Sequence, residues 1–527
     1  MTSELERMAA TGRRAVQSND WPTVGACATE ILKRDRDHPE GHFLLGLAEK
    51  VAQRPAKAAA AFAKVLELDA GRYDAAVELA NQHSIGRRNA DAAALLASYE
   101  PKLVNSPRYL DMAATIYTEI GMAEKAWPLY QQANQLQPDV PLFQANLAAC
   151  GVYLGKIQES KAIYQALLER TPNHQRNHYH LSRLERAADT AHIEQMKQVL
   201  ASTGLPPERN IFLYYALGKE LEDLGQWQEA FSYYKKAGDA VTAVARYDVG
   251  EDIALIDKVI EVCSEDWLAA GPKSVPTEIT GKTPVFIVGL PRTGTTLTER
   301  ILASHSRVES LGETLFMQMN LRLLSGVQSV ESMTPAMIEA VAGCDIGLLA
   351  NAYLNSVNYR LGDKPMFIDK LPFNFLYLGF IAKAYPDARL VHLRRNPMDA
   401  CFAMYKQVFT WAYKFSYSLE GLGQYYVAHE RLARHWQRVL GDRLVEVDYE
   451  ALVADQEGQT RKLLDRLGLE FEQGCLDFDK NKAASATASS VQVREKIHTR
   501  SVARWRNFEE QLQPLKEMLE SAGIAVE

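Results

Sequence analysis

A period of 34 residues in the first part of the chain restricts its fold more than any other feature. Small residues recur at this spacing in two registers, and a large apolar residue recurs in a third. The three sets are Gly46, Ala80, Ala114 and Ala148; Ala58, Ala92, Ala126 and Ser160; and Phe62, Leu96, Tyr130 and Tyr164. Small residues let paired helices approach closely, so the period predicts a stack of antiparallel helix pairs.

The spacing resembles the tetratricopeptide repeat, with an aromatic residue on the second helix and a proline, such as Pro138 or Pro172, closing the unit. Nearly all of residues 5–250 reads as helix, and Leu217 to Ala237 repeats the pattern after an irregular stretch. We therefore predict a solenoid whose concave face binds a protein or peptide. A solenoid that only scaffolds the rest of the chain, or joins it into a homodimer, is the alternative.

Three histidines lie just after Pro172, at positions His174, His178 and His180. No acidic residue or cysteine accompanies them, so we interpret this stretch as a solvated repeat junction and not as a metal site.

The helical pattern fades before a stretch marked by proline and glycine, Leu268 to Thr277. We place a domain boundary near residue 275, which gives domains 1–275 and 276–527. Beyond it, strand-like runs alternate with helices, which predicts an α/β domain with a parallel sheet. The runs are Pro284–Val288, Met366–Ile368, Ala388–Leu393 and Leu444–Val447.

A glycine-bracketed turn follows the first of these runs. Gly289 and Gly294 permit a tight turn before a helix, so that backbone N–H groups converge on an anion such as phosphate. Nucleoside triphosphatases place a lysine after the second glycine, but this chain has Thr295 there. That substitution disfavours a metal-dependent kinase and makes Arg292 the predicted cation of the turn.

The run Pro291 to Thr296 resembles the phosphosulfate loop of sulfotransferases that use 3′-phosphoadenosine 5′-phosphosulfate (PAPS). The resemblance covers about residues 283–510 and is closest to tyrosylprotein sulfotransferases and to bacterial sulfotransferases with tetratricopeptide repeats. It implies a P-loop-like α/β domain, PAPS as co-substrate, no metal, and an acceptor that is a tyrosine of a protein or peptide. Carbohydrate, lipid or small-molecule hydroxyls are the alternative acceptors. The donor-binding residues of the loop would be Arg292, Thr293, Gly294, Thr295 and Thr296.

The same resemblance places a catalytic glutamate at Glu313 and a catalytic lysine at Lys370. Glu313 would accept the proton of the attacking hydroxyl. Lys370, with Arg292 and Ser489, would stabilise charge on the bridging oxygen of the leaving phosphate. Asp369 would pair with Lys370 and hold it. His305 is the rival base, although its position on the helix after the loop favours a packing or supporting role.

After the strand that ends near residue 393, the resemblance assigns the 3′-phosphate to Arg395, with Arg394 as the alternative register. Relatives carry a serine and a further arginine where this chain has Ala403 and Gln407. The groups that would compensate for the missing phosphate contacts are Asn396, Cys401 and backbone N–H groups. A degenerate transferase domain in an interaction protein is the alternative function.

The polar segment Thr487–His498 resembles the loop that folds over the nucleotide. Its predicted donor-binding residues, together with one arginine that follows it, are Ser489, Ser490, Gln492, Arg494, Lys496 and Arg504. Tyr425, on an amphipathic helix, is predicted beside the adenine, and core packing is the alternative for it.

The formal net charge of −7 argues against a protein that coats nucleic acid. The six cysteines are far apart and form no C-x-x-C pair, as expected of reduced thiols. The polar start of the sequence and the lack of an apolar run of about eighteen residues predict no signal peptide and no membrane anchor. We therefore expect a cytoplasmic, bacterial protein.

Overall fold

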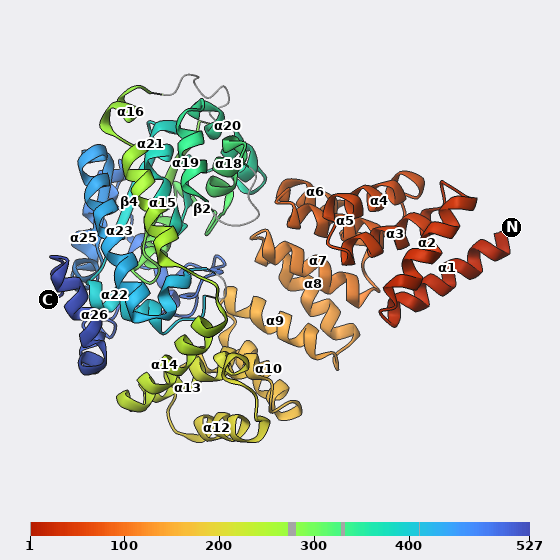
Figure 1. The fold of residues 1–527 in the computed structure, drawn as a ribbon, viewed down its shortest axis with the longest axis horizontal. Helices are drawn as coiled ribbons and strands as arrows, with labels where there is room; N and C mark the ends of the chain where they lie inside the picture. The colour runs from red at the N-terminus through yellow and green to blue at the C-terminus, as the bar shows by residue number, and fades with distance from the viewer. Residues whose placement is uncertain (1, 272–280, 328–332, 410–411) are drawn as a thin grey trace. The chain divides into compact units, whose positions relative to one another are not determined.

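The computed structural model describes residues 2–271, 281–327, 333–409 and 412–527 (Figure 1). By its contacts the chain divides into two compact units, Met1–Gly151 and Val152–Glu527. The boundary predicted near residue 275 falls in 272–280, outside the described residues, and stays a prediction.

The first unit is built of helix pairs, and from α1 to α8 each helix packs on the next. Its helices are α1 (Thr2–Gln17), α2 (Trp21–Arg34), α3 (Pro39–Val51), α4 (Pro55–Leu68), α5 (Tyr73–Ile85), α6 (Asn89–Tyr99), α7 (Pro107–Glu119), α8 (Ala123–Leu136) and α9 (Pro141–Tyr153), the last of which ends in the second unit. The predicted registers explain the packing. A Cβ atom on Gly46 of α3 would lie 2.5 Å from the ring of Phe62 on α4, and Ala58 is fully buried.

The second unit begins with more helices. They are α10 (Ile157–Arg170), α11 (Gln175–Ser182), α12 (Ala191–Thr203), α13 (Ile211–Asp223), α14 (Trp227–Val244), α15 (Val249–Val262) and α16 (Glu265–Ala269). The pair α13 and α14 repeats the packing of the first unit, because a Cβ atom on Gly218 would lie 2.5 Å from the ring of Tyr234. The all-helical first part of the predicted fold is thus confirmed.

A parallel sheet of five strands follows, in the order β2-β3-β1-β4-β5. The strands are β1 (Thr283–Gly289), β2 (Val308–Ser310), β3 (Met366–Asp369), β4 (Arg389–Arg394) and β5 (Leu444–Asp448). Alternate residues of β1 pack into two hydrophobic cores on opposite faces of the sheet. Phe286 belongs to one core and Val285 to the other. Four strands lie where the sequence predicts them. The strand β2 is not among the predicted runs, because its three residues are too few to show an apolar run or an alternation of apolar and polar residues.

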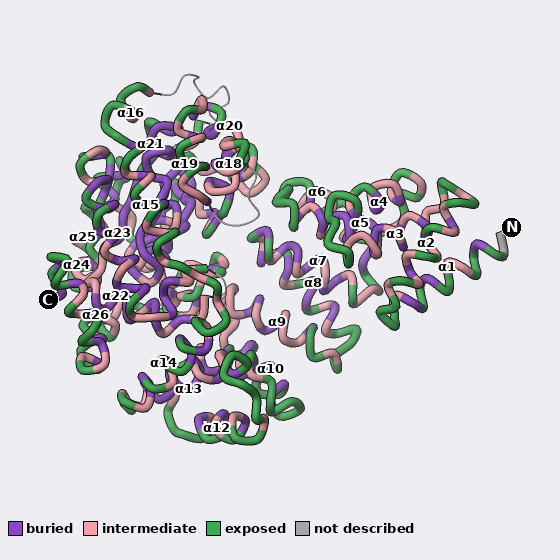
Figure 2. The backbone as a smooth tube through the Cα atoms, in the orientation of Figure 1, coloured by how far each residue is buried: buried purple, intermediate pink, exposed green. Residues whose placement is uncertain are grey.

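Helices cover both faces of this sheet (Figure 1). They are α17 (Thr295–Ala303), α18 (Phe316–Ser325), α19 (Pro335–Ala342), α20 (Ile346–Val357), α21 (Leu378–Ala384), α22 (Pro397–Tyr405), α23 (Leu419–Leu440), α24 (Tyr449–Ala454), α25 (Gln456–Leu467) and α26 (Glu509–Ser521). Nearly every residue of β1 and β3 is buried, and Figure 2 shows buried backbone among the surrounding helices.

The helices that precede the sheet share its core. Phe231 of α14 stacks on Tyr405 of α22 with ring centroids 5.9 Å apart. The carboxylate of Glu222, buried at the end of α13, accepts hydrogen bonds from Lys406 at 2.5 Å and from Arg504 at 3.0 Å. These contacts explain why α13 and α14 belong to the same compact unit as the sheet.

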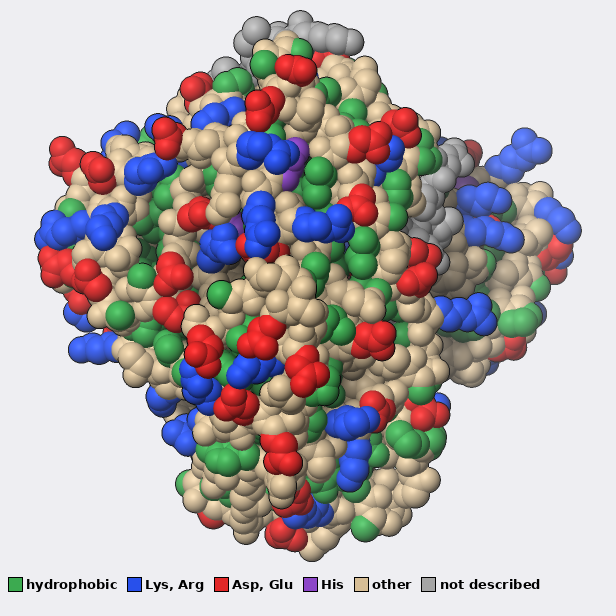
Figure 3. All heavy atoms as spheres, turned by 60° about the vertical axis from the view of Figure 1, so that its left-hand side comes forward, with side chains coloured by type: hydrophobic (Ala, Val, Ile, Leu, Met, Phe, Trp, Pro, Cys, Tyr) green, Lys and Arg blue, Asp and Glu red, His purple; other side chains and the backbone are tan. Residues whose placement is uncertain are grey.

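Acidic and basic side chains are interspersed over the face of the molecule that Figure 3 shows, in keeping with the small net charge. In the described part of the chain, no single helix is long and apolar enough to cross a membrane. The pair Pro335–Ala342 and Ile346–Arg360, bent by 111°, meets that length and composition only jointly.

We expect Gly238→Ala to lower the stability of the second unit. A Cβ atom on this α14 residue would lie 2.4 Å from the carbonyl oxygen of Tyr417, and backbone cannot move as a side-chain tip does. The free energy of unfolding should fall by about 1–3 kcal/mol. Gly25→Ala is the control, because nothing lies within 4 Å of its added Cβ. That change should leave stability unchanged or raise it by up to about 1 kcal/mol. Scanning calorimetry of both variants measures the difference, and equal melting profiles would contradict this packing.

Candidate functional site

The turn between β1 and α17 depends on its two glycines. Gly289 has φ 148° and Gly294 has φ 102°. A Cβ atom on Gly289 would lie 2.7 Å from the carbonyl oxygen of Leu393, and one on Gly294 would lie 2.6 Å from the ring of Tyr449. The hydroxyl of Thr293 donates to the carbonyl of Leu290 at 2.7 Å and closes the turn. The chain thereby presents the N-terminus of a nine-residue helix to the turn.

Arg292 extends from this turn to the polar loop, the segment Thr487–His498. Its guanidinium donates to the hydroxyl of Ser489 and to the side-chain oxygen of Gln492, the latter at 2.6 Å. The hydroxyl of Thr296 lies 3.4 Å from that of Thr487. The structure thus brings together residues that the sequence analysis placed at the donor, although they are far apart in the chain.

Arg395 lies on the other side of the same turn. It donates to the carbonyl of Arg292 at 2.7 Å and to that of Ser501 at 2.5 Å, and its guanidinium lies 4.8 Å from the ring centroid of Tyr449. Its Nε atom is buried and has no hydrogen-bond partner among the described residues. Arg394 instead donates to both carboxylate oxygens of Glu430 at 3.1 Å. Of the two alternative registers, only Arg395 therefore lies at the turn.

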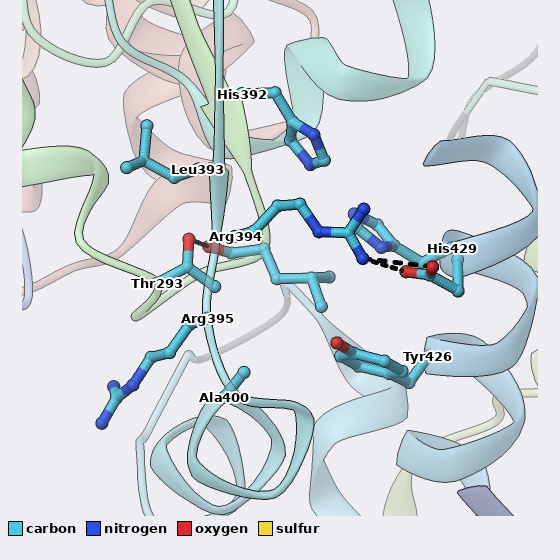
Figure 4. Close-up of a pocket in the computed structure, with 10 residues that line it drawn as sticks. Thr293, His392, Leu393, Arg394, Arg395, Ala400, Tyr426 and His429 are labelled. Atoms are coloured by element: carbon cyan, nitrogen blue, oxygen red, sulfur yellow. Dashed lines mark hydrogen bonds and ion pairs between the residues drawn. The ribbon is translucent and has the colours of Figure 1, made fainter. Parts of the chain in front are cut away.

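Figure 4 shows Arg394 and Arg395 leaving β4 in different directions beside a small pocket. The pocket is lined by Leu290, Thr293, His392, Leu393, Arg394, Arg395, Ala400, Tyr426, His429 and Glu430. Burial holds the pKa of His429 well below its usual range, so the ring is neutral. Burial also lowers the pKa of His392, which stacks on Phe375 as a core histidine.

Lys370 directly follows β3, the strand beside β1, and is fully buried. Its ammonium forms an ion pair with Glu313 and lies 3.7 Å from a carboxylate oxygen of Glu299. Although burial disfavours the ammonium, Glu313 and Glu299 raise the pKa of Lys370, so the side chain is charged. Glu313 is 38% exposed and forms the open side of the pair.

Glu299 is a member of this cluster that the sequence analysis missed. It lies on α17, the helix that begins at the turn, and it accepts a hydrogen bond from Ser310 at 2.6 Å. Glu299 therefore links the buried lysine to the helix that starts at the glycine-bracketed turn.

One prediction for this region is wrong. Asp369 does not pair with Lys370. Its carboxylate accepts hydrogen bonds from Thr314 at 2.6 Å and Tyr353 at 2.7 Å, because successive strand residues point to opposite faces. His305 is not available as a base, since one ring nitrogen lies 3.0 Å from the carbonyl of Glu470 and the other accepts from the N–H of Arg307 at 3.1 Å.

Several residues predicted at the nucleotide contact other elements instead. Tyr425 is buried and stacks on Phe415 with ring centroids 3.6 Å apart, in agreement with the core-packing alternative. Arg494 donates to the carbonyls of Tyr153 and Ala483, at 2.8 and 3.3 Å, and Arg504 donates to Glu222. These arginines fasten the polar loop and the segment after it to the helices. Of the other residues predicted at the donor, Thr295 and Ser490 are buried and Lys496 is exposed.

Arg183, just after α11, reaches this region without any signal in the sequence. It donates to the side-chain oxygen of Gln407 at 2.8 Å, to the hydroxyl of Tyr179 at 3.0 Å and to the carbonyl of Ala488 at 2.7 Å. The pair Arg183 and Gln407 is 224 residues apart in the chain, so no local pattern connects them.

The two side chains suggested as compensation for Ala403 and Gln407 have other roles. Asn396 caps α22 by accepting from the N–H groups of Met398 and Asp399, at 3.0 and 3.2 Å. Cys401 is fully buried, and burial raises the pKa of its thiol.

Comparisons with known proteins find separate likenesses in two parts of the chain. Residues 284–473 match the model described as the sulfotransferase family. An uncharacterised protein of Aquifex aeolicus is 29% identical over 422 residues, which are 79% of this chain and 55% of that protein. The chain thus spans about half the length of this relative. A putative protein-tyrosine sulfotransferase of Caenorhabditis briggsae is 22% identical over 228 residues, covering 42% of this chain and 80% of that protein.

Solved structures match each part separately. The sulfotransferase domain of the Synechococcus PCC 7002 olefin synthase is 19% identical, with a TM-score of 0.33, and covers 49% of this chain and 98% of that domain. YrrB, a tetratricopeptide repeat protein with an unusual peptide-binding site, is 16% identical, with a TM-score of 0.29, and covers 40% of this chain and 97% of that protein.

The buried carboxyl of Asp369 predicts a pH dependence of stability. Burial raises its pKa to about 6, above the value of about 4 expected in the unfolded chain. Between these values the folded chain holds a proton that the unfolded chain has released, so this group makes stability fall as the pH rises. Asp369→Asn removes the effect, and its stability relative to the original chain should increase by on the order of 3 kcal/mol from pH 4 to pH 7. Thermal unfolding of both proteins across this range tests the prediction, which parallel pH profiles would refute.

Proposed function

We propose that this chain, which joins tetratricopeptide-like helix pairs to a sulfotransferase-family domain, transfers a sulfuryl group from PAPS to an acceptor hydroxyl. One observation carries the proposal. Arg292 and Arg395 lie at the glycine-bracketed turn after β1 without a carboxylate ion-paired to either within the described ranges, and Lys370, which follows the neighbouring strand β3, forms an ion pair with Glu313. The first group of residues suits a polyanionic donor, and the second suits proton transfer.

The residues at the turn fit a donor with phosphate at two places. The buried Nε–H of Arg395 lacks a hydrogen-bond partner among the described residues, as expected of a group that awaits an anion. Arg292 and the N–H groups at the start of α17 would bind the phosphosulfate, and Arg395 would bind the 3′-phosphate. PAPS supplies a sulfuryl group on a phosphate leaving group. Ser489 and Gln492, which now accept from Arg292, would close the loop over it.

Glu313 is the proposed general base because its carboxylate is the exposed member of the ion pair. The acceptor oxygen forms a bond to sulfur as the bond from sulfur to the phosphate oxygen breaks, and the hydroxyl proton passes to Glu313. Lys370 is charged and lies between Glu313 and Glu299, so it is placed to stabilise negative charge on the leaving phosphate.

The proposed acceptor is a tyrosine of a protein or peptide. Two relatives from Caenorhabditis species carry the name protein-tyrosine sulfotransferase, one of them as putative, and helix-pair solenoids commonly bind peptides. A carbohydrate or other small-molecule hydroxyl is the alternative. We also propose a cytoplasmic location, since all six cysteines are free thiols, as is usual in a reducing compartment.

Calorimetric titration with 3′-phosphoadenosine 5′-phosphate, the desulfated product, tests the donor. We expect micromolar binding, no comparable binding of ATP, and about 10- to 100-fold weaker binding by Arg395→Gln, because a charge-assisted hydrogen bond is lost. Arg389→Gln is the control, since this exposed arginine begins the same strand. Failure of the original chain to bind the bisphosphate, or equal binding of ATP, would refute a PAPS-dependent transferase.

Glu313→Gln tests the base. The amide keeps the shape of the side chain but cannot accept the proton, so kcat with a tyrosine peptide should fall by about 100- to 10,000-fold while affinity for the bisphosphate is retained. Release of the bisphosphate product measures turnover. Glu510→Gln, an exposed glutamate in the first turn of α26, should leave kcat unchanged. Turnover of Glu313→Gln within twofold of the original chain would rule out the general-base role.

A further inference from the structure

We propose that Arg183, a residue of the helices that precede the sheet, binds a phosphate of the donor and supplies the positive charge that Gln407 does not. This inference rests on the proposed function, because it assigns a further residue to the same donor site. It also makes the helical stretch around α11 a part of that site and not only a support for it.

The position of Arg183 is fixed from three directions. Its Nη1 group donates to Gln407 at 2.8 Å and to the hydroxyl of Tyr179 at 3.0 Å, and its Nη2 group donates to the carbonyl of Ala488 at 2.7 Å. The guanidinium also lies 5.3 Å from the ring centroid of Tyr179. An arginine held in this way presents its remaining N–H groups in a fixed orientation.

The contacts of Arg183 are with segments that border the turn. Gln407 follows α22, the helix that begins two residues after Arg395. Ala488 immediately precedes Ser489, whose hydroxyl accepts from Arg292. Arg183 therefore lies between the segment after β4 and the loop that contacts the turn.

The charges at this place are unbalanced. No carboxylate forms an ion pair with Arg183, Arg292 or Arg395 in the part of the chain that the structure describes. Burial, and then the nearby guanidiniums of Arg183 and Arg395, lower the pKa of Arg292 to about 10. Guanidiniums so close together repel one another, and a bound polyanion would relieve that repulsion.

Gln407 explains why the cation is needed from another element. Its side chain is only 7% exposed and is neutral, and its amide donates to the hydroxyl of Tyr179 at 3.2 Å while it accepts from Arg183. Gln407 therefore carries no charge itself and instead accepts a hydrogen bond from the guanidinium of Arg183. A swap of the two side chains would keep one guanidinium in the same place.

The experiment uses the full chain and titration with 3′-phosphoadenosine 5′-phosphate. Arg183→Gln should bind it about 10- to 100-fold more weakly than the original chain, the loss expected for one charge-assisted hydrogen bond. The exposed Arg186 donates to the carbonyl of Asp223 and provides the matched control. Arg186→Gln removes the same charge from the same segment and should bind as the original chain does.

A double variant separates a binding role from a bracket that merely holds the loop. Arg183→Gln combined with Gln407→Arg returns the charge but not the bond to Ala488, and it should recover most of the lost affinity. Equal affinity of Arg183→Gln and the original chain would overturn the inference. So would a loss that the double variant does not reduce and that accompanies a lower melting temperature of the unliganded protein. If the original chain itself fails to bind, the proposed function is refuted and not the role of Arg183 alone.

Discussion

The two hydrogen bonds of Arg395 to backbone carbonyls are the interaction on which the site depends most. They connect the end of β4 to the turn at Arg292 and to the C-terminal segment at Ser501. The same guanidinium lies over Tyr449, and the Tyr449 ring fills the space where a side chain on Gly294 would have to lie. The shape of the turn, the position of the polar loop and the need for glycine are therefore set together. The arrangement fixes the turn and leaves the buried Nε–H group of Arg395 without a hydrogen-bond partner among the described residues.

Local patterns predicted the local structure well. The 34-residue period gives the contact between Gly46 and Phe62, and the apolar runs give four of five strands. The glycine-bracketed turn and the residues at the strand ends could be placed because a parallel sheet brings its carboxyl ends to one edge. The clustering of Arg292 with Ser489 and Gln492 followed from resemblance, and the structure gives it a geometry. Their roles in donor binding stay predictions.

Contacts between distant segments could not be predicted from the sequence. Arg183 and Gln407 meet only because helices of the solenoid type pack on the sheet, and nothing near either residue reports it. Glu299 looked like one more polar residue of a helix, although it faces Lys370. The wrong partner for Lys370 arose because adjacent residues were paired by sequence proximity, whereas a strand sends neighbours to opposite faces.

The core shared by α14 and α22 has a consequence for how such chains diversify. Phe231 and Glu222 belong to the helical part by sequence, yet they complete the interior of the sheet unit. Exchange of solenoids between related proteins must therefore leave α13 and α14 with their original partner. A recombination point at the proline- and glycine-marked stretch would remove apolar packing partners from the unit that contains the sheet, whereas one near residue 151 would preserve them. The modules that evolution can shuffle are thus offset from those that the repeat pattern outlines.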